Sequence, residues 1–320
     1  MTRLVFAVLS IAAVLLPVRL VHAAPYAYIT NQGSNSVSVI DLATDAVIDT
    51  IAVGNRPAGV AASRSGDRIY VSNPESKDVS VIDGATRKVI GTLKVGEGPL
   101  GIALHPDGGT LYVADWYLNI VSVFDTTTLR QTARIPVGRS PSGLALDLAG
   151  KRLYVTNRDD DTLSVLDART FAPIALIATG KAPFGVTLTP DGRRAFTANV
   201  QSSDVTIIDT EALAVTDTIP VHDFPYAVAV DTARNRIFVT NQHDDSVSVI
   251  DLGLGEEIKR LDVSGYPEGI ALAPDGRHVY VANWFANAVD VISTESLELV
   301  GNIAVGEGCR AFGEFIAPRP

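Results

Sequence analysis

Short apolar runs separated by turn residues fill the chain, and the clearest set lies within one 42-residue stretch. Its four runs span Gly59 to Ala62, Arg68 to Ser72, Asp78 to Asp83 and Lys88 to Lys94. β-Branched and aromatic residues dominate the runs, as is typical of strands. The segment Ser65–Asp67 has the composition of a tight hairpin turn. The pattern predicts a unit of four short antiparallel strands.

This unit recurs seven times. An aromatic residue followed three positions later by Asn or Asp begins at Tyr28, Tyr70, Tyr112, Tyr154, Phe196, Phe238 and Tyr280. A second motif, of the type Val37-Ser-Val-Ile-Asp41, follows nine residues after each start. A proline then stands just before the first strand of the following unit, at Pro57, Pro99, Pro141, Pro183, Pro225 and Pro267. Cys309 takes this place in the seventh copy. A four-stranded unit at this spacing predicts an all-β, seven-bladed β-propeller of antiparallel blades.

The ends of the chain predict how the ring closes. The first repeat begins at its second strand, near Tyr26, with no first strand before it. The segment Cys309–Phe315 stands at the first-strand position and has no later strands after it. We therefore expect the C-terminal strand to pair with the N-terminal strands, which completes the seventh blade and removes an exposed edge.

The first 23 residues have the pattern of a signal peptide. Arg3 precedes an apolar stretch, Leu4–Pro17, and Val21-His-Ala23 suits cleavage before Ala24. A membrane anchor is the rival prediction, but Arg19 interrupts the apolar stretch, which is short for a bilayer span. We expect export to the periplasm or beyond, with residues 24–320 forming the propeller.

Composition limits the function further. The 320 residues carry a formal charge of −10, so the chain repels phosphate backbones and we do not expect a nucleic-acid partner. Cys309 is the one cysteine, which excludes an internal disulfide and predicts a buried small side chain.

Residues present in every copy are expected to serve the blade, because every blade needs them. The recurrent Tyr or Phe predicts core packing, and the Asn or Asp after it predicts side-chain closure of a turn. Function is then expected where the copies differ, on the face that carries the loops between second and third strands and those leading into each first strand.

Candidate binding residues lie in these loops. Both tryptophans have an aromatic neighbour, in the pairs Trp116-Tyr117 and Trp284-Phe285. They predict either a ligand or partner surface, or contacts between blades. Arg139 and Arg310 lie just before a first strand, near the axis, as do Arg56 and Lys181. They predict either a positive ring that attracts an anionic ligand or ion pairs with neighbouring acidic loops.

One blade carries imidazole and carboxylate groups in two neighbouring loops, namely His222, His243, Asp244 and Asp245. Such groups predict a possible divalent metal site, although acidic loops are usually only solvated. The chain lacks the nucleophile-elbow, zinc-protease, haem-attachment and phosphate-loop motifs. We therefore predict no catalytic residue from motifs, and no cofactor other than this metal.

The repeated Tyr-Val-Thr-Asn, Val-Ser-Val-Ile-Asp and proline motifs resemble the YVTN family of β-propeller repeat proteins over residues 26–317. The ending Arg310–Ile316 resembles the terminal strand of periplasmic members associated with PQQ-dependent catabolism, although Cys309 stands where proline is expected. The resemblance implies a periplasmic binding or scaffold protein for an unidentified ligand or protein partner. The fold is also similar to that of lactonases and lyases, so a metal-assisted hydrolase or lyase is the alternative hypothesis.

Overall fold

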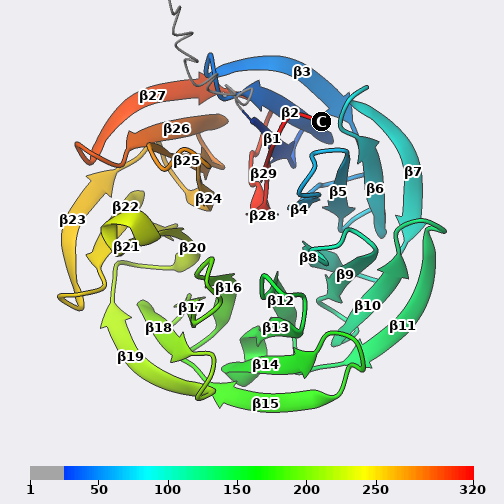
Figure 1. The fold of residues 1–320 in the computed structure, drawn as a ribbon. Helices are drawn as coiled ribbons and strands as arrows, with labels where there is room; N and C mark the ends of the chain where they lie inside the picture. The colour runs from blue at the N-terminus through cyan, green and yellow to red at the C-terminus, as the bar shows by residue number, and fades with distance from the viewer. Residues whose placement is uncertain (1–24) are drawn as a thin grey trace, which may run out of the picture.

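A computed structural model describes residues 25–320, which form seven sheets set around a central axis (Figure 1). The predicted seven-bladed propeller of four-stranded antiparallel blades is confirmed. The signal peptide predicted at residues 1–23 lies outside the described residues. Within 25–320, no helix has the length and apolar character needed to cross a membrane.

Each blade runs outward from the axis through strands A, B, C and D. The strands A of six blades are β4 (Gly59–Ala62), β8 (Pro99–Leu104), β12 (Pro141–Leu146), β16 (Pro183–Leu188), β20 (Pro225–Asp231) and β24 (Pro267–Leu272). The strands B are β1 (Tyr26–Asn31), β5 (Arg68–Asn73), β9 (Thr110–Asp115), β13 (Arg152–Asn157), β17 (Arg194–Asn199), β21 (Arg236–Asn241) and β25 (His278–Asn283).

The outer half of each blade has the same regularity. The strands C are β2 (Ser36–Asp41), β6 (Asp78–Asp83), β10 (Ile120–Asp125), β14 (Thr162–Asp167), β18 (Asp204–Asp209), β22 (Ser246–Asp251) and β26 (Ala288–Ser293). The strands D are β3 (Ala46–Ala52), β7 (Lys88–Lys94), β11 (Arg130–Pro136), β15 (Pro173–Ala178), β19 (Ala214–Pro220), β23 (Glu256–Asp262) and β27 (Glu298–Ala304). Two single turns of 3₁₀ helix, η1 (Arg158–Asp160) and η2 (Thr232–Arg234), and the short C-terminal strands β28 (Phe312–Glu314) and β29 (Ile316–Ala317) complete the fold.

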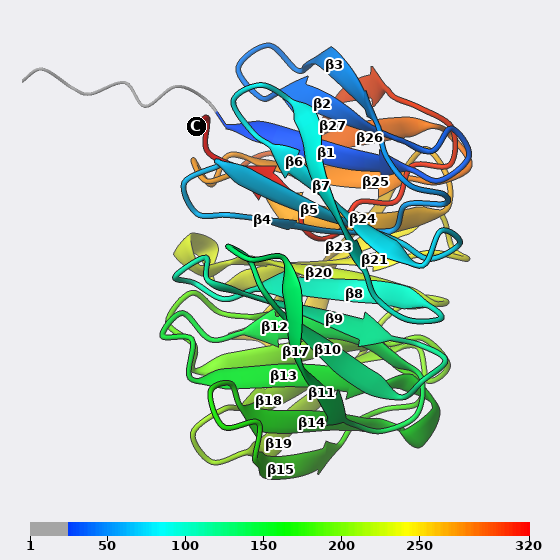
Figure 2. The ribbon, with the colours of Figure 1, turned by 90° about the vertical axis from the view of Figure 1, so that its right-hand side faces the viewer.

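The blades have two distinct edges, which define two faces of the disc. The turns from A to B and from C to D form what we call the turn face, and the loops from B to C and from D to A form the loop face. The described N-terminal end and the C-terminus lie together on the turn face (Figure 2). Figure 1 is viewed from this face.

Strands B and C are buried on both sides because blades pack against each other, whereas most residues of strands D face solvent. The repeated aromatic residue of strand B is fully buried, as predicted; Tyr112, for example, donates from its hydroxyl to the Ala168 carbonyl of the next blade at 2.8 Å. The repeated Asn also acts as predicted. Asn31 Nδ2 donates to Ser36 Oγ at 3.0 Å and to Ser38 Oγ at 2.9 Å, joining strands B and C beside their turn.

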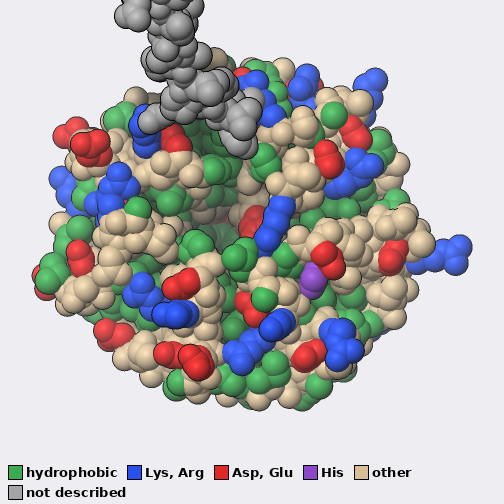
Figure 3. All heavy atoms as spheres, viewed as in Figure 1, with side chains coloured by type: hydrophobic (Ala, Val, Ile, Leu, Met, Phe, Trp, Pro, Cys, Tyr) green, Lys and Arg blue, Asp and Glu red, His purple; other side chains and the backbone are tan. Residues whose placement is uncertain are grey.

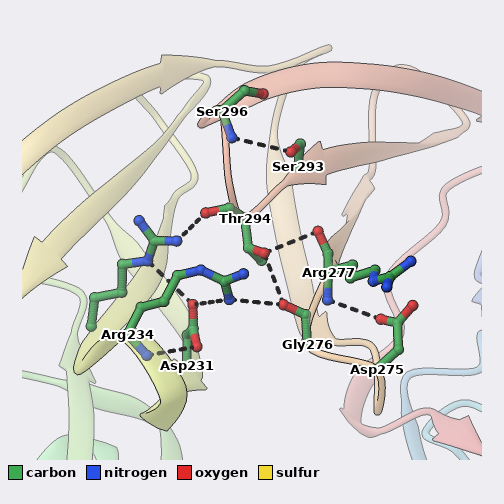
Figure 4. Close-up of polar contacts among 9 residues, drawn as sticks. Asp231, Arg234, Asp275, Gly276, Arg277, Ser293, Thr294 and Ser296 are labelled. Carbon is green, nitrogen blue, oxygen red and sulfur yellow. Dashed lines mark hydrogen bonds and ion pairs between the residues drawn. The ribbon is translucent and has the colours of Figure 1, made fainter.

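Polar contacts between blades reinforce the turn face (Figure 4). Buried Asp231 pairs with Arg234 at 3.2 Å, and Arg234 also donates to the Gly276 carbonyl of the next blade at 3.0 Å. The Thr294 hydroxyl donates to the same carbonyl at 2.8 Å. The Arg234 contact ties neighbouring blades together, while the other two hold its partners in place within each blade. Cys309 is buried, as predicted.

The ring closes through the C-terminal segment, as predicted. Cys309 lies opposite Asn31, and β29 then pairs antiparallel with β1 through Ala317 and Tyr26. The predicted single strand over Cys309–Phe315 is wrong in one respect. The segment is divided, and β28 instead pairs in parallel with β4 of the neighbouring blade.

A two-residue bulge explains this division. In a regular blade Leu146 lies opposite Leu153, and the repeat spacing would place Glu314 opposite Ala27. Ile316 occupies that place instead, two residues later. Gly313 permits the bulge, because its φ is +106° and a Cβ there would lie 2.6 Å from the Val60 carbonyl oxygen. The bulge therefore shifts Phe312–Glu314 toward the axis.

Candidate functional site

Seven residues close the central channel toward the loop face. Each one comes directly after the repeated proline of its blade, or after Cys309 in the seventh blade. Every blade therefore contributes one side chain at the start of strand A. They are Ala58, Leu100, Ser142, Phe184, Tyr226, Glu268 and Arg310. None of the seven is exposed, although their chemical types differ from blade to blade. We call this set the plug.

Arg310, predicted as part of an exposed positive ring, is instead paired within the plug. Its Nε contacts Glu268 Oε2 and its Nη2 contacts the Tyr226 hydroxyl, while Gln242 Nε2 donates to Glu268 Oε1 at 2.8 Å. Burial alone would lower the pKa of Arg310, but the facing Glu268 carboxylate and Tyr226 raise it above its ordinary value. Arg310 thus remains charged. Burial raises the pKa of Glu268, and the Arg310 charge and the hydrogen bonds from Arg310 and Gln242 act against that shift.

Aromatic rings from inside and outside the plug pack around Phe184. Phe184 lies 4.1 Å from Tyr226 and 5.1 Å from Phe312 between ring centroids. Trp116 reaches Phe184 at 6.2 Å, and the Arg158 guanidinium lies 5.6 Å from the centre of the Trp116 ring. Trp116 therefore serves the contact between blades, whereas the adjacent Tyr117 is 71% exposed.

The second predicted aromatic pair belongs to a continuous row of rings on the loop face. Phe224 stacks on His243 at 3.7 Å, and His243 lies 5.5 Å from Tyr266. Tyr266 contacts Trp284 at 5.7 Å and Phe285 at 4.7 Å between centroids. We call these five residues the aromatic strip. It crosses two blades, and Phe285 at its end is 66% exposed.

The backbone holds two members of the strip in an unusual conformation. Phe224 and Tyr266 precede a strand A proline and have φ of +56° and +55°, the left-handed region that bulky residues rarely adopt. Glycine occupies the same position in two other blades, at Gly98 and Gly308. Asp245 Oδ1 accepts from the Tyr266 amide at 2.7 Å and supports this conformation. Arg56, Ser140 and Ala182 adopt the same conformation at this loop position, so the blade architecture sets it and the two rings project from it onto the loop face.

Sequence reasoning missed Phe224 and Tyr266. A signal was present, because aligning the seven D-to-A loops places an aromatic residue before proline in these two blades alone.

Arg139 and Arg56 form ion pairs with acidic loops. This agrees with the second interpretation of these arginines, ion pairing, and not with a positive ring. Arg139 Nε lies 2.5 Å from Asp160 Oδ1 and its Nη2 is 2.5 Å from the Asp159 carbonyl. Arg56 pairs with Glu75 at 3.0 Å. The structure does not form a ring of unpaired positive charge from these residues.

Of the four predicted metal ligands, the structure brings His222 and Asp244 together and engages His243 and Asp245 in other contacts. His222 lies 3.6 Å from Asp244 and 3.2 Å from Glu257, but His243 turns away to stack on Phe224. Asp244 is instead held by Arg260 at 2.8 Å. Partial burial would raise the pKa of Asp244, but hydrogen bonds from Arg260 and Ser246 lower it. Asp245 is engaged by the Tyr266 amide. Across residues 25–320, no group of three or more His, Cys, Asp or Glu side chains is arranged to hold a metal ion.

The channel is open on the opposite, turn face. Its cavity measures about 410 Å³ and is lined mainly by apolar residues of strands A. Figure 3 shows this face, with a hollow at its centre walled largely by hydrophobic side chains. Sequence reasoning placed the functional surface on the loop face and did not identify this pocket.

Comparisons with known proteins agree with the architecture. The model of the YNCE-like β-propeller family matches residues 8–105 and 142–232, more than half of the chain. The chain belongs to this family. A lactonase model, also a seven-bladed propeller, matches residues 85–170 of this YNCE-like protein.

Solved structures show the same fold. Hydrazine synthase from Kuenenia stuttgartiensis is 25% identical with a TM-score of 0.76, covering 89% of this chain and 99% of that one. A functionally unknown protein from Desulfotomaculum acetoxidans is 16% identical with a TM-score of 0.77, covering 89% and 98%. The dihydro-heme d1 dehydrogenase NirN is 15% identical with a TM-score of 0.69, covering 91% and 76%.

Among curated proteins, PE_PGRS18 of Mycobacterium tuberculosis is 61% identical over 36 residues. That match spans 11% of this chain and 8% of the mycobacterial protein.

Proposed function

We propose that this chain is an exported binding propeller whose aromatic strip on the loop face docks a protein partner. The strip is the observation that carries the proposal. Interfaces between proteins depend on clustered aromatic side chains, which contribute large apolar area at little cost in side-chain entropy. A row of five rings with an exposed end, kept partly against backbone preference, has these properties.

The surroundings of the strip favour a protein over other partners. The plug closes the channel on this face, so the strip lies on a surface and not around a deep pocket. The charge of −10 opposes binding of a phosphate backbone. Trp284 Nε1 donates to Gln32 Oε1 at 3.3 Å, which fixes the ring against the neighbouring blade and prepares the surface for rigid docking.

The compartment and pathway are part of the same proposal. The residues of the predicted signal peptide support export, and the resemblance of Arg310–Ile316 to PQQ-associated propellers supports a partner that takes part in periplasmic oxidation. On this view the chain supplies a rigid surface and the partner carries out the chemistry.

The test compares three immobilised forms of the chain exposed to periplasmic extract. Phe285→Ala removes the exposed end of the strip, and Leu176→Ala is the matched control because Leu176 is 68% exposed on strand D, far from the strip in sequence. We expect wild type and Leu176→Ala to retain the same protein and Phe285→Ala to bind it at least about tenfold more weakly. Equal retention by all three forms would contradict the proposal.

A metal-assisted hydrolase is the second candidate, favoured by the lactonase match over residues 85–170. The matched segment excludes His222, His243, Asp244 and Asp245, and of these only His222 and Asp244 lie close together. This candidate therefore has less support than the binding function.

A further inference from the structure

One position breaks the apolar pattern of the channel wall. The residue four places after each plug residue is Ala62, Leu104, Leu146, Leu188, Val230, Leu272 and, in the closing blade, Glu314. All seven line the cavity. A carboxylate thus stands where six blades place an aliphatic side chain. The two-residue bulge next to Gly313 brings it there.

The Glu314 carboxylate has no hydrogen-bond or ion-pair partner within residues 25–320. Its side chain is reached by water in the channel yet is surrounded by protein, and this burial raises the pKa of Glu314. The nearby Arg64 charge acts in the opposite direction and offsets part of the cost of an ionised carboxylate, but burial has the larger effect on the pKa of Glu314.

The other polar side chains of the pocket are already satisfied. Thr187 Oγ1 donates to the Val228 carbonyl at 2.8 Å, and Thr189 Oγ1 to Asp191 Oδ1 at 2.5 Å. His105 Nε2 lies 3.0 Å from the Gly150 carbonyl. Glu314 is therefore the lining group left to recognise a ligand.

Arg64 lines the same pocket as Glu314, and its charge acts on the Glu314 carboxylate. Its Nη2 donates to the Leu148 carbonyl at 3.4 Å, two blades away, and its side chain is exposed to solvent. Water reaches both side chains, but the protein around Glu314 has a larger effect on its pKa than Arg64 has, and a charge within an apolar channel interacts more strongly with a ligand than a charge in open solvent. The inner carboxylate should therefore select the sign of the ligand.

We propose that the channel is a second binding site, open on the turn face, for a small organic cation with an apolar body and one ammonium group. The apolar walls would take the body, and Glu314 would accept hydrogen bonds from the ammonium group. A cavity of about 410 Å³ lies in the size range of pockets that enclose small molecules. The plug gives the pocket a closed end, so the ligand enters and leaves by the turn face. This site is separate from the aromatic strip.

The experiment uses n-octylammonium, octanoate and 1-octanol as probes, which share one apolar chain and differ in charge. Isothermal titration calorimetry measures each with wild type, Glu314→Gln and Glu211→Gln. The last variant is the control, because Glu211 is exposed in a C-to-D turn of the same face and its loss changes the net charge equally. We expect octylammonium to bind wild type and Glu211→Gln alike and to bind Glu314→Gln at least about tenfold more weakly.

Three results would overturn the proposal. Octanoate binding that exceeds octylammonium binding and is lost in Arg64→Ala would make this an anion site. Equal binding of all three probes, unaffected by Glu314→Gln, would make it an apolar cavity without charge selection. Absence of binding by every probe would remove the site altogether. Circular dichroism of each variant confirms that the fold is intact.

Discussion

The two ends of the central channel are built from the same strands A yet have opposite properties. At the loop face the strands begin with seven side chains that meet and exclude water, including the buried pair of Arg310 and Glu268. Four residues later the same strands leave an open pocket with an unpaired carboxylate at Glu314. Each end takes one residue from every blade, and the two ends differ in residue type and in the bulge beside Gly313 that brings Glu314 into the channel.

This comparison shows where a repeat protein gains individuality. Positions that support the blade keep their type because each copy buries an aromatic ring on strand B, as at Tyr112, and a polar side chain at its end, as at Asn31. Positions around the axis contact their counterparts from other blades. A single departure at these positions, such as Glu314 among six aliphatic residues, therefore changes the character of the channel.

The largest effect is expected at the closed end. Glu268→Ala leaves Arg310 buried without its partner, and we expect the free energy of unfolding to fall by about 3–5 kcal/mol. Urea unfolding followed by circular dichroism measures this change. Replacing both partners, as Glu268→Leu with Arg310→Met, should recover most of the loss. A loss below about 1 kcal/mol in Glu268→Ala would show that the pair is not sequestered from water.

A smaller, pH-dependent effect is expected at the open end. Burial raises the pKa of Glu314 above its unfolded value of 4.5, so between these two pKa values the folded state binds more protons. The contribution of Glu314 to the free energy of unfolding is therefore complete below pH 4.5 and is lost as the pH rises through the pKa of the folded state. Channel water screens the charge, and we expect a loss below about 1 kcal/mol.

The measurement is the difference in unfolding free energy between wild type and Glu314→Gln across this pH range. The variant should lose stability less steeply than wild type as pH rises, while Glu211→Gln follows wild type. A difference of opposite sign would mean that the fold favours the ionised carboxylate.

An exposed pair provides the contrast to the closed end. Arg139→Ala removes the ion pair with Asp160 on the loop face, where solvent screens both groups. We expect the unfolding free energy to change far less than in Glu268→Ala, measured in the same urea series. A loss as large as that of Glu268→Ala would place Arg139 among the groups that stabilise the plug.

No effect is expected on metal content. After mild dialysis, elemental analysis of the purified protein should find no stoichiometric divalent ion, and His243→Ala should give the same result, because His243 stacks on Phe224 away from His222. A stoichiometric ion that disappears in His243→Ala would instead favour the hydrolase candidate and lead to a lactone substrate screen.

Features that repeat in every blade, such as the strands, could be predicted from the sequence. Contacts between side chains of different blades around the axis could not. The strands Asp78–Asp83 and Lys88–Lys94 follow from local residue type and turn chemistry, and the structure has the same bounds. The pairing of Arg310 with Glu268 was missed because the two residues are 42 positions apart and meet only when the ring closes. Glu314 was missed because its exposure to the channel depends on the bulge beside Gly313.

The central claim, a channel closed at one end and open at the other, can be tested by thiol labelling on one strand. Wild type provides a low background, because Cys309 is its one cysteine and burial raises the pKa of its thiol to about 12. Leu146→Cys places a thiol on the pocket wall, and Ser142→Cys places one in the plug. We predict that a small methanethiosulfonate reagent labels Leu146→Cys fully and leaves Ser142→Cys and wild type unlabelled. Equal labelling of the two variants, or labelling of Ser142→Cys alone, would contradict the account.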